Sequence, residues 1–429
     1  MNSQRVAILG GNRTPFARVN SAFHELEADA LLTQALAGLV ARFGLAGARP
    51  GLVAGGAVLK SQRHFNLVRE AVLGTALDPA TPCMDLQQAC ATSLQAALTI
   101  ADRIALGRID WGIACGVDSA SNPPLELSDG LRAVLLRFAR ARGLVDRLRV
   151  LAALRPSHLL AAPPSGREPR TGLRMGEHAE LSARAWGISR ESQDDLALHS
   201  HLALAAAWER GFFAELVTPL AGLARDNILR PDTSLARLAG LGPAFASDPR
   251  ATITAGNASA LTDGAAAVLL GSESWARTRG LTPLAWLRDH ETAAVDFFTG
   301  AEVNQREGLL LAPVYAVPRL LLRAGLSLQD FDLYEIHEAF AAQVLCTLKA
   351  WSDRDFCRTR LGLPDALGEI DRSRLNLAGS SLATGHPFAA TGARILATAA
   401  RLLAERDSGR CLVSVCAAGG QGVCAILER

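Results

Sequence analysis

Residues 84–97 read MDLQQACATSLQAA, a short strand that runs directly into a helix, and the rest of the architecture can be worked out from this junction. The helix is indicated by apolar residues at helical spacing, namely Leu94, Ala97, Leu98, Ala101 and Ile104. Cys90 therefore falls at the first turn, where free backbone N–H groups and the helix dipole favour a thiolate and lower the pKa of a thiol. This position predicts a nucleophile, and a buried structural cysteine is the alternative interpretation.

Strand and helix patterns alternate on both sides of this junction. Strands are predicted at residues 5–10, 52–59, 83–87 and 110–117, and helices at 27–43, 65–73 and after Cys90. Such alternation is typical of an α/β protein with a mainly parallel sheet that is covered on both faces.

The same alternation returns in the second part of the chain. The sheet pattern resumes at 251–259 and 263–270; further strands are predicted at 284–288, 333–336, 411–416 and 423–427, and helices at 313–324, 338–351 and 389–404. Each series contains a buried helix whose entry carries a reactive residue, Cys90 in the first and His386 in the second. This weak internal duplication predicts two similar layers packed together, with both helix starts facing one site.

An insertion separates the two series. We divide the chain into a first half (1–122), an insertion (123–245), the end of the first half (246–279) and a second half (280–429); Pro123-Pro124 and Pro163-Pro164 mark loops in the insertion. Residues 131–154 contain six arginines and a single acid among large apolar residues, which is a basic amphipathic profile. A solvated helical pair is one interpretation, and docking to a membrane surface or a partner subunit is the other.

Composition limits the possible classes of protein. The chain has 429 residues, 49% of them hydrophobic, and a net charge of +2 with its arginines scattered among acids, so a nucleic-acid partner is not indicated. The start lacks the pattern of a signal peptide, and no apolar run is long enough to span a membrane, so we expect a soluble cytoplasmic protein. The eight cysteines show no paired CxxC spacing, so we expect free thiols and no zinc site.

Three further residues complete a chemical inventory. His337 follows a predicted strand, His386 lies between glycine and proline at a helix start, and Cys416 ends a strand before a glycine-rich turn. A lone histidine is more often structural than functional. Together with Cys90, however, these residues supply a nucleophile, a base, an oxyanion donor and a second thiol that can move a proton.

The chain resembles the thiolase family nearly end to end, and within it most closely the thiolase subunit of the fatty-acid β-oxidation trifunctional complex. The resemblance is carried by GGNRTPFAR, DLQQACATSLQAA, TGLRMGEHAE, RPDTSLARLAGLGPAF, TAGNASALTDGAAAVLL, IHEAFAAQ, SSLATGHPFAATGARI and CAAGGQGVCAILE. It implies the thiolase fold: two duplicated βαβαβαββ halves in α-β-α-β-α layers with a helical insertion.

The resemblance also implies roles for individual residues. Cys90 is the acylated nucleophile, His386 the base that activates it, and Cys416 the acid/base. His337 and His386 form one oxyanion hole, and the backbone N–H groups of Cys90 and Ala418 form a second. Coenzyme A is expected to contact Arg230, Ser259 and Met175.

The implied activity is that of an acetyl-CoA C-acyltransferase or C-acetyltransferase: reversible, CoA-dependent cleavage of 3-ketoacyl-CoA through an acyl-cysteine. No metal or permanently bound cofactor is expected. Expected partners are further copies of the chain in a dimer or tetramer, an enoyl-CoA hydratase/3-hydroxyacyl-CoA dehydrogenase subunit, and a membrane surface. The chain departs from the family pattern at Ser93, which is expected to crowd a tightly packed helix, and at Ser380-Ser381, where glycines are common.

Two alternatives stay open. A β-ketoacyl synthase shares the fold and the cysteine nucleophile but lacks an acid/base thiol at the position of Cys416. A non-catalytic scaffold would have no need of the set Cys90, His337, His386 and Cys416.

Overall fold

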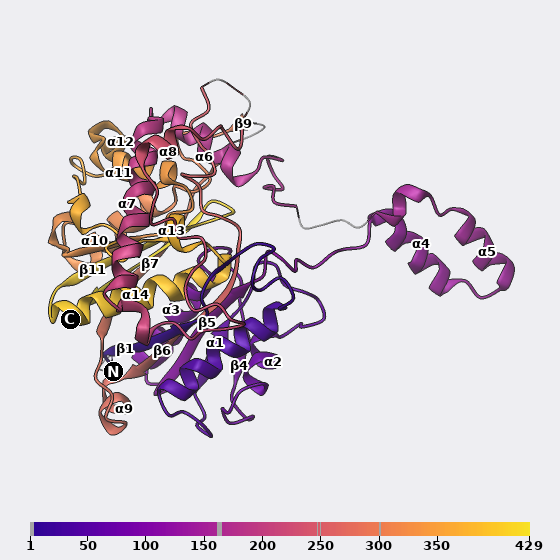
Figure 1. Ribbon diagram of the computed structural model, residues 1–429, viewed down its shortest axis with the longest axis horizontal. Coiled ribbons are helices and arrows are strands. Elements are labelled where there is room, and N and C mark those ends of the chain that lie inside the picture. Colours follow the sequence, from indigo (N-terminus) through magenta and orange to yellow (C-terminus); the bar gives the residue numbers. More distant parts are fainter. Residues whose placement is uncertain (1–3, 161–164, 247, 249, 300–301) are drawn as a thin grey trace. The chain divides into compact units, whose positions relative to one another are not determined.

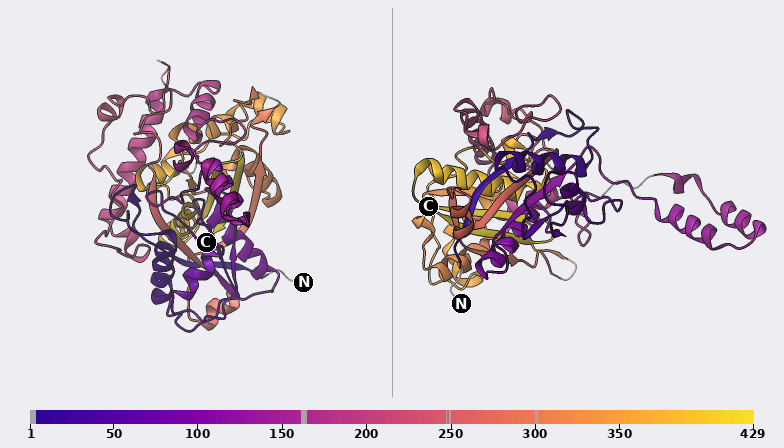
Figure 2. Two further views of the ribbon diagram at one scale, coloured as in Figure 1. Left: turned by 90° about the vertical axis from the view of Figure 1, so that its right-hand side faces the viewer. Right: turned by 90° about the horizontal axis from the view of Figure 1, so that it is seen from below.

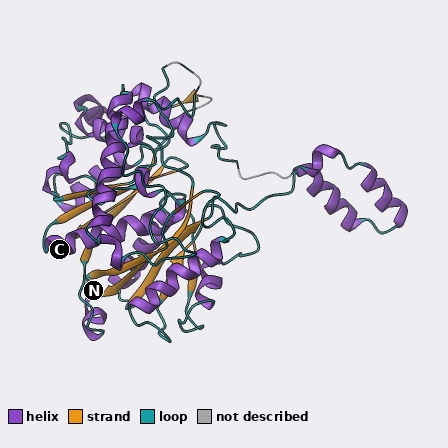
Figure 3. Cartoon of the chain, in the orientation of Figure 1, coloured by secondary structure: helices purple, strands orange, loops and turns teal. Residues whose placement is uncertain are grey.

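The computed structural model describes residues 4–160, 165–246, 248, 250–299 and 302–429 (Figure 1). Pro163 and Pro164 lie outside the described residues. The chain divides into a large unit, residues 1–122 and 167–429, and a small unit, residues 123–166. Residues 167–245, which we expected to belong to the insertion, are thus part of the large unit, which also contains every described strand (Figure 3).

The first half of the sheet has the strand order β4-β3-β5-β6-β1. Its strands are β1 (Val6–Arg13), β3 (Leu52–Gly55), β4 (Cys83–Asp85), β5 (Trp111–Asp118) and β6 (Thr262–Ser272). In β1, Val6 and Ile8 enter one hydrophobic core while Ala7 and Leu9 enter another. This alternation is expected of a strand that is buried on both faces.

The second half repeats this arrangement in the order β10-β11-β12-β7. Its strands are β7 (Ala285–Ala294), β10 (Leu333–Ile336), β11 (Arg410–Ala417) and β12 (Gln421–Glu428). The pairs β3–β5 and β10–β11 are parallel, whereas β5–β6, β11–β12, β6–β1 and β12–β7 are antiparallel. Order and direction agree for four strands of each half, β3-β5-β6-β1 and β10-β11-β12-β7, while β4 has no counterpart among the described strands. The predicted internal duplication is therefore confirmed.

The two halves are joined edge to edge by β1 and β7, which pair antiparallel with Val6 opposite Leu287 and Ile8 opposite Ala285. Together with the short β2 (Ala17–Arg18), which pairs with β6, they form one ten-stranded sheet. The expectation of a mainly parallel sheet was wrong, because β12 folds back on β11 through a tight turn, and β6 returns antiparallel to β5.

Helices form three layers around these strands. Figure 2 shows the chain from two further sides. The outer layers contain α1 (Ala28–Arg42) and α2 (Leu67–Leu73) on the first half, and α10 (Pro313–Ala324) and α11 (Ala341–Ser352) on the second. The middle layer is α3 (Thr92–Ala105) packed against α14 (Thr391–Arg406), with core residues from both halves around it. One half of the sheet packs on each side of this helix pair, and an outer helix layer covers the other face of each half. The expected five-layer α-β-α-β-α arrangement is therefore confirmed.

The two middle helices approach closely near their N-termini. A Cβ atom on Gly392 would lie 2.4 Å from the backbone nitrogen of Leu94, so only glycine fits there. Ser93 does not crowd this contact as we expected. Its buried hydroxyl accepts a hydrogen bond of 2.8 Å from the backbone N–H of Ala393 and so links the two helices.

The remaining elements of the large unit are mostly short helices. They are α6 (Met175–Ala185), α7 (Arg190–Glu209), α8 (Leu235–Ala239), α9 (Glu273–Thr278), α12 (Arg354–Arg360), α13 (Ser381–Thr384), the 3-10 helices Phe212–Glu215, Leu328–Asp330, Arg372–Arg374 and Phe388–Ala390, and the strand pair β8 (Phe298–Thr299) and β9 (Glu302–Val303). Residues 251–259 are not a strand. The side chain of Glu180 accepts hydrogen bonds from the backbone of Thr252 and Ile253, and Asn257 accepts one from Thr254, so side chains replace ladder partners here.

The small unit consists of α4 (Asp129–Arg140), α5 (Leu144–Ala152) and the 3-10 helix Pro156–Leu159. Several of its large apolar side chains are exposed, namely Leu135, Leu136, Leu144, Val145, Leu148 and Leu151. Six arginines are exposed on the same two helices and the turn between them: Arg132, Arg137, Arg140, Arg142, Arg147 and Arg149. In the part of the chain that the structure describes, no helix is both long and apolar enough to cross a membrane.

Candidate active site

Cys90 lies in the turn between β4 and α3, just before the residue that caps the helix. The sequence suggested that Cys90 lies in the first helical turn, but it lies just before the helix. The turn is held by Thr92, whose hydroxyl accepts from the backbone N–H of Gln88 at 2.9 Å and donates to the carbonyl of Ala89 at 2.7 Å. Ala89 has a φ of +46°, a left-handed conformation that is uncommon for alanine and typical of strained functional turns.

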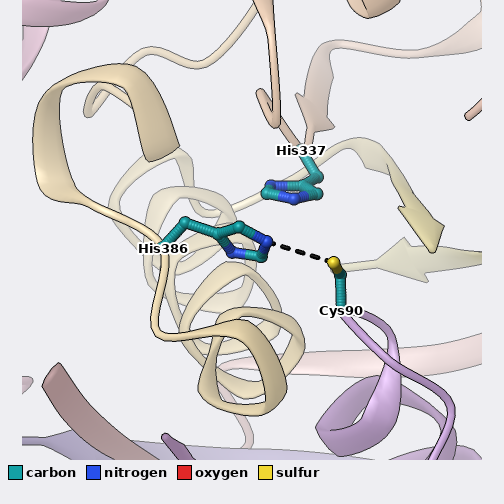
Figure 4. Close-up of side chains that lie close together, drawn as sticks. All are labelled: Cys90, His337 and His386. Atoms are coloured by element: carbon teal, nitrogen blue, oxygen red, sulfur yellow. Dashed lines mark hydrogen bonds between the residues drawn. The ribbon is translucent and has the colours of Figure 1, made fainter. Parts of the chain in front are cut away.

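His386 comes from the equivalent place in the second half, between α13 and α14. Its backbone N–H donates to the hydroxyl of Thr262 at 2.7 Å, and its Nδ1 lies 2.7 Å from the hydroxyl of Thr391. Its Nε2 lies 3.1 Å from the Sγ of Cys90 (Figure 4). If Nδ1–H donates to Thr391, Nε2 presents the lone pair that can take the thiol proton.

Gly385 gives His386 this position. Its φ is +99°, and a Cβ atom there would lie 2.6 Å from a side-chain carbon of Thr262 and 2.8 Å from one of Ile228. Both the backbone conformation and the lack of space therefore require glycine. The duplication thus brings the two helix entries together, as predicted.

The expected lowering of the pKa of Cys90 was wrong in direction. Burial of its thiol raises the pKa to about 12, against the lowering effect of the backbone N–H of Ala418 and of its own backbone N–H, and the nearby Asp118 raises it further. Burial also lowers the pKa of His386 to about 3, with a smaller contribution from Arg394. The resting pair is therefore a neutral thiol and a neutral imidazole, because desolvation outweighs the local dipoles.

His337 follows β10 and is fully buried. Its ring centre lies 4.2 Å from that of His386, and its Nδ1 lies 2.9 Å from the hydroxyl of Ser381. Its Nε2 has no hydrogen-bond partner among the described residues. Burial, with His386 and Arg394 as smaller causes, lowers its pKa well below the usual value, so this imidazole is also neutral.

Cys416 lies near the end of β11 and is also buried. Burial raises its pKa well above that of a free thiol, and negative charge on Cys90 would raise it further. Two residues later the backbone N–H of Ala418 points at the sulfur of Cys90 and lowers the pKa of this thiol. The turn continues through Gly419 and Gly420, both in the left-handed region.

The three residues expected to contact coenzyme A, Met175, Ser259 and Arg230, differ in their surroundings. Met175 packs in an apolar cluster that also contains Cys416, Phe340 and Phe245. Ser259 donates from its hydroxyl to the carbonyl of Ala339 at 2.9 Å, close in sequence to His337. Arg230 is exposed. Ile228, two residues earlier in the chain, has its side chain beside Gly385.

Sequence reasoning missed several polar residues that hold this site. Thr262 and Thr391 bind His386, Asp118 accepts from the backbone of Ala389, and Ser381 and Arg394 lie behind His337. The motifs ALTDG, SSLATGHP and ATGAR contain four of them, so the signal was a polar residue inside an otherwise apolar motif.

Donor atoms of Cys90, His337 and His386 all lie within 4.8 Å of one another, close enough for a soft metal ion. The same proximity is what proton transfer between a thiol and an imidazole requires.

The chain is similar to known proteins along nearly its whole length. Residues 6–274 match the family described as thiolase, N-terminal domain, and residues 281–429 match thiolase, C-terminal domain. The chain is 43% identical over 431 residues to the 3-ketoacyl-CoA thiolase of Pectobacterium atrosepticum, with 99% of this chain and 96% of that protein covered. It is 41% identical over 430 residues to that of Yersinia pestis (strain Pestoides F), with 99% and 97% covered.

A solved structure is also similar along its whole length. The crystal structure of the Bacillus anthracis acetyl-CoA acetyltransferase superposes with a TM-score of 0.80 at 29% identity, and the match covers 100% of both chains. By sequence and by structure, the chain belongs to the thiolase family.

Proposed function

We propose that the protein cleaves 3-ketoacyl-CoA with coenzyme A to give acetyl-CoA and a shortened acyl-CoA. The observation that carries the proposal is the 3.1 Å contact between Cys90 Sγ and His386 Nε2, with the unpaired Nε2 of His337 beside it. The relatives named 3-ketoacyl-CoA thiolase support the same reaction.

The first half-reaction begins with transfer of the Cys90 proton to His386. The thiolate attacks the keto carbon of the substrate, and the bond between C2 and C3 breaks. The acyl group stays on Cys90, and the electron pair stays on C2 as the enolate of acetyl-CoA. Cys416 then gives its thiol proton to C2, and acetyl-CoA leaves.

The second half-reaction reverses the roles of the two thiols. The thiolate of Cys416 takes the proton of free coenzyme A, whose sulfur attacks the acyl carbon on Cys90. The tetrahedral intermediate collapses, Cys90 leaves as thiolate, and His386 returns its proton. Every residue is then in its starting state, so neither a redox cofactor nor a metal takes part in these steps.

Two sets of donors stabilise the oxygens that become negative. His337 and protonated His386 face the thioester oxygen of the enolate, and the backbone N–H groups of Cys90 and Ala418 face the oxygen of the tetrahedral intermediate. A preorganised donor of this kind typically lowers a barrier by about 3 to 4 kcal/mol, and more in a dry site than in water. The burial of His337 and His386 provides such a site for the first set of donors.

The apolar cluster around Cys416 offers a place for the pantetheine arm of coenzyme A. Met175 and Phe245 lie at its partly exposed side, and Phe245 contacts Phe340 with ring centres 5.6 Å apart. Ser259 follows Ala258, which belongs to this cluster. Arg230 supplies an exposed positive charge for the phosphates of coenzyme A. Coenzyme A acts in this proposal as a substrate and not as a resident cofactor.

Thiolysis with purified protein tests the proposal. Acetoacetyl-CoA and longer 3-ketoacyl-CoA substrates are incubated with coenzyme A, and both product thioesters are quantified by chromatography. From the wild type we expect two acetyl-CoA for each acetoacetyl-CoA, and equimolar acetyl-CoA and shortened acyl-CoA from each longer substrate. Cys90→Ala should give none of these products. A wild type no more active than Cys90→Ala would refute the proposal and favour a scaffold.

The same proposal includes the protein's surroundings. We infer a cytoplasmic, dimer-based enzyme whose small unit docks to an anionic membrane surface. Exposed leucines together with exposed arginines on α4 and α5 support this, since an interfacial helix inserts apolar side chains while its basic residues contact lipid phosphates. Docking to a hydratase/dehydrogenase subunit instead of lipid is an alternative outcome of the test given below.

A further inference from the structure

The Nε2 atom of His337 is an unpaired polar atom at the centre of the site. It is buried, has no hydrogen-bond partner among the described residues, and belongs to a ring that lies against His386 (Figure 4). Leaving a buried polar atom unpaired is costly unless a ligand satisfies it. A neutral histidine can offer either an N–H or a lone pair at this atom, and only the N–H can stabilise an enolate oxygen.

The hydrogen bonds behind the ring decide between these two forms. Nη2 of Arg394 donates to the hydroxyl oxygen of Ser381 at 2.6 Å, and a guanidinium can only donate. The other partner of this hydroxyl is Nδ1 of His337 at 2.9 Å. Since the oxygen accepts from Arg394, the single O–H of Ser381 is free to donate to Nδ1.

The two tautomers differ in how many buried groups they leave unpaired. If Ser381 donates to Nδ1, the ring proton is on Nε2, and only this N–H is unpaired, where the substrate oxygen would bind. If Nδ1 carries the proton and donates to Ser381, the serine O–H loses its acceptor among the described residues, and Nε2 directs a lone pair at the site. The first arrangement satisfies one more buried group.

We propose that Ser381, oriented by Arg394, is a positioning residue that keeps the His337 proton on Nε2, so that this imidazole is a hydrogen-bond donor to the substrate oxygen. The inference rests on the proposed thiolase activity and adds to it the residue that makes His337 competent. Neither Ser381 nor Arg394 touches the substrate in this proposal.

Buried charges hold Arg394 in place. Its guanidinium also donates to the hydroxyl of Ser380 at 3.2 Å, and its side chain is buried between the two halves. Burial lowers the pKa of Arg394 to about 10, and Arg13 lowers it too, but Glu335 and Glu338 favour the charged form, so the side chain stays a cation. The Arg394 cation therefore stays next to Ser381. There it donates to the serine oxygen, and the hydroxyl proton of Ser381 remains available to donate to His337.

A double-mutant cycle tests the proposal. Ser381→Ala should lower kcat about tenfold or more, with little change in KM, because the lost donor acts in the transition state. His337→Asn carries an amide N–H and has no tautomers, so adding Ser381→Ala to it should change kcat less than about threefold. Equal losses in both backgrounds would mean that Ser381 is merely structural, and no loss in either would also overturn the proposal.

Ser414→Ala is the matched control. Ser414 is buried, and its backbone carbonyl accepts from the backbone N–H of His337, but its hydroxyl has no hydrogen-bond partner among the described residues. Its removal should leave kcat near that of the wild type. A loss equal to that of Ser381→Ala would assign the effect to packing and overturn the proposal.

A spectrum separates this inference from the activity itself. In wild-type protein labelled with ¹⁵N-histidine, long-range ¹H–¹⁵N correlations identify the protonated ring nitrogen, and the His337 signals are those missing from His337→Asn. We expect protonated Nε2. Protonated Nδ1 overturns the inference even if thiolysis is normal or Ser381→Ala fails to fold, whereas an inactive wild type with protonated Nε2 refutes only the proposed function.

Discussion

The carboxylate of Asp118 accepts a hydrogen bond of 2.7 Å from the backbone N–H of Ala389. Asp118 ends β5 in the first half, and Ala389 belongs to the segment of the second half that follows His386. The same carboxylate accepts from the backbone of Val58 and Leu59. One side chain thus ties the nucleophile's half of the molecule to the segment that carries the base.

This carboxylate predicts a pH dependence of stability. Burial raises the pKa of Asp118 to about 7 against three backbone N–H donors, which lower it. Between its unfolded pKa of about 4 and its folded value the native state binds more protons than the unfolded chain, so the contribution of Asp118 to stability falls as pH rises. Asp118→Asn, which does not titrate, should therefore cost less stability at pH 8 than at pH 5, measured by chemical denaturation. A cost that grows with pH would contradict this prediction.

A single cysteine should be acylated during turnover. Among the described residues, Cys90 is the one whose sulfur is hydrogen-bonded to an imidazole, while the sulfurs of Cys115, Cys357 and Cys424 contact backbone carbonyls. Brief exposure to labelled acetyl-CoA followed by peptide mapping should place the label on Cys90. A label on Cys416 with Cys90 unmodified would reverse the roles assigned to the two thiols.

The free enzyme should lack a stable thiolate. Because burial raises the pKa of Cys90 and lowers that of His386, the alkylation rate of Cys90 by iodoacetamide should keep rising with pH through the range from about 6 to 10. Cys90→Ala gives the background from other thiols. A rate that levels off below pH 8 would show a preformed thiolate–imidazolium pair instead.

Loss of the oxyanion donor should affect the chemical step and not the fold. His337→Ala should lower kcat by roughly a hundredfold or more, because the donor acts on charge that develops in the transition state. His337→Asn should recover part of this loss. Stopped-flow thiolysis together with thermal unfolding checks both, and near-normal turnover of the alanine variant would make His337 structural.

Much of the site could be predicted because the duplication is visible in the sequence. Proline and glycine bound the helix Pro313–Ala324, and Leu333–Ile336 forms the strand that was expected. The meeting of Cys90 and His386 follows from two equivalent helix entries. The raised pKa of Cys90 could not be read in the same way, since it depends on burial by segments far away in the chain.

Side-chain hydrogen bonds between residues far apart in the sequence could likewise not be predicted from the pattern of apolar and polar residues. Residues 251–259 alternate like a strand, yet Glu180 supplies their hydrogen bonds from α6. Ser381 stands where a glycine was expected, and the sequence alone shows only that the residue differs. Its role depends on Arg394, whose side chain returns from the next helix to the same hydroxyl.

The small unit should be dispensable for short substrates. Replacing Arg137, Arg140, Arg142 and Arg147 by glutamine should abolish co-sedimentation with anionic vesicles, since each arginine near such a surface contributes about 1 kcal/mol and salt weakens the attraction. Cleavage of acetoacetyl-CoA should persist.

The control for this prediction has the same change in charge on the large unit. Four exposed arginines there are suitable: Arg49, Arg63, Arg277 and Arg358. Their replacement should leave vesicle binding intact. A wild type that binds no vesicles at low salt would refute lipid docking, and co-purification with a hydratase/dehydrogenase subunit would then assign the surface to that partner.

The pairing of β1 with both β6 and β7 has a consequence for how the chain is made. On the ribosome, residues 6–13 emerge long before their hydrogen-bonding partners, which are residues 266–272 on one side and 285–287 on the other. The closing strand β12, which lies between β7 and β11, is made after both of them. The nascent protein therefore holds unpaired strand edges during most of its synthesis, a state that is prone to aggregation and slow to resolve. Removing only the final residues 421–429 would leave β7 and β11 without the strand that joins them, so a nearly complete chain would still fail to assemble its second half.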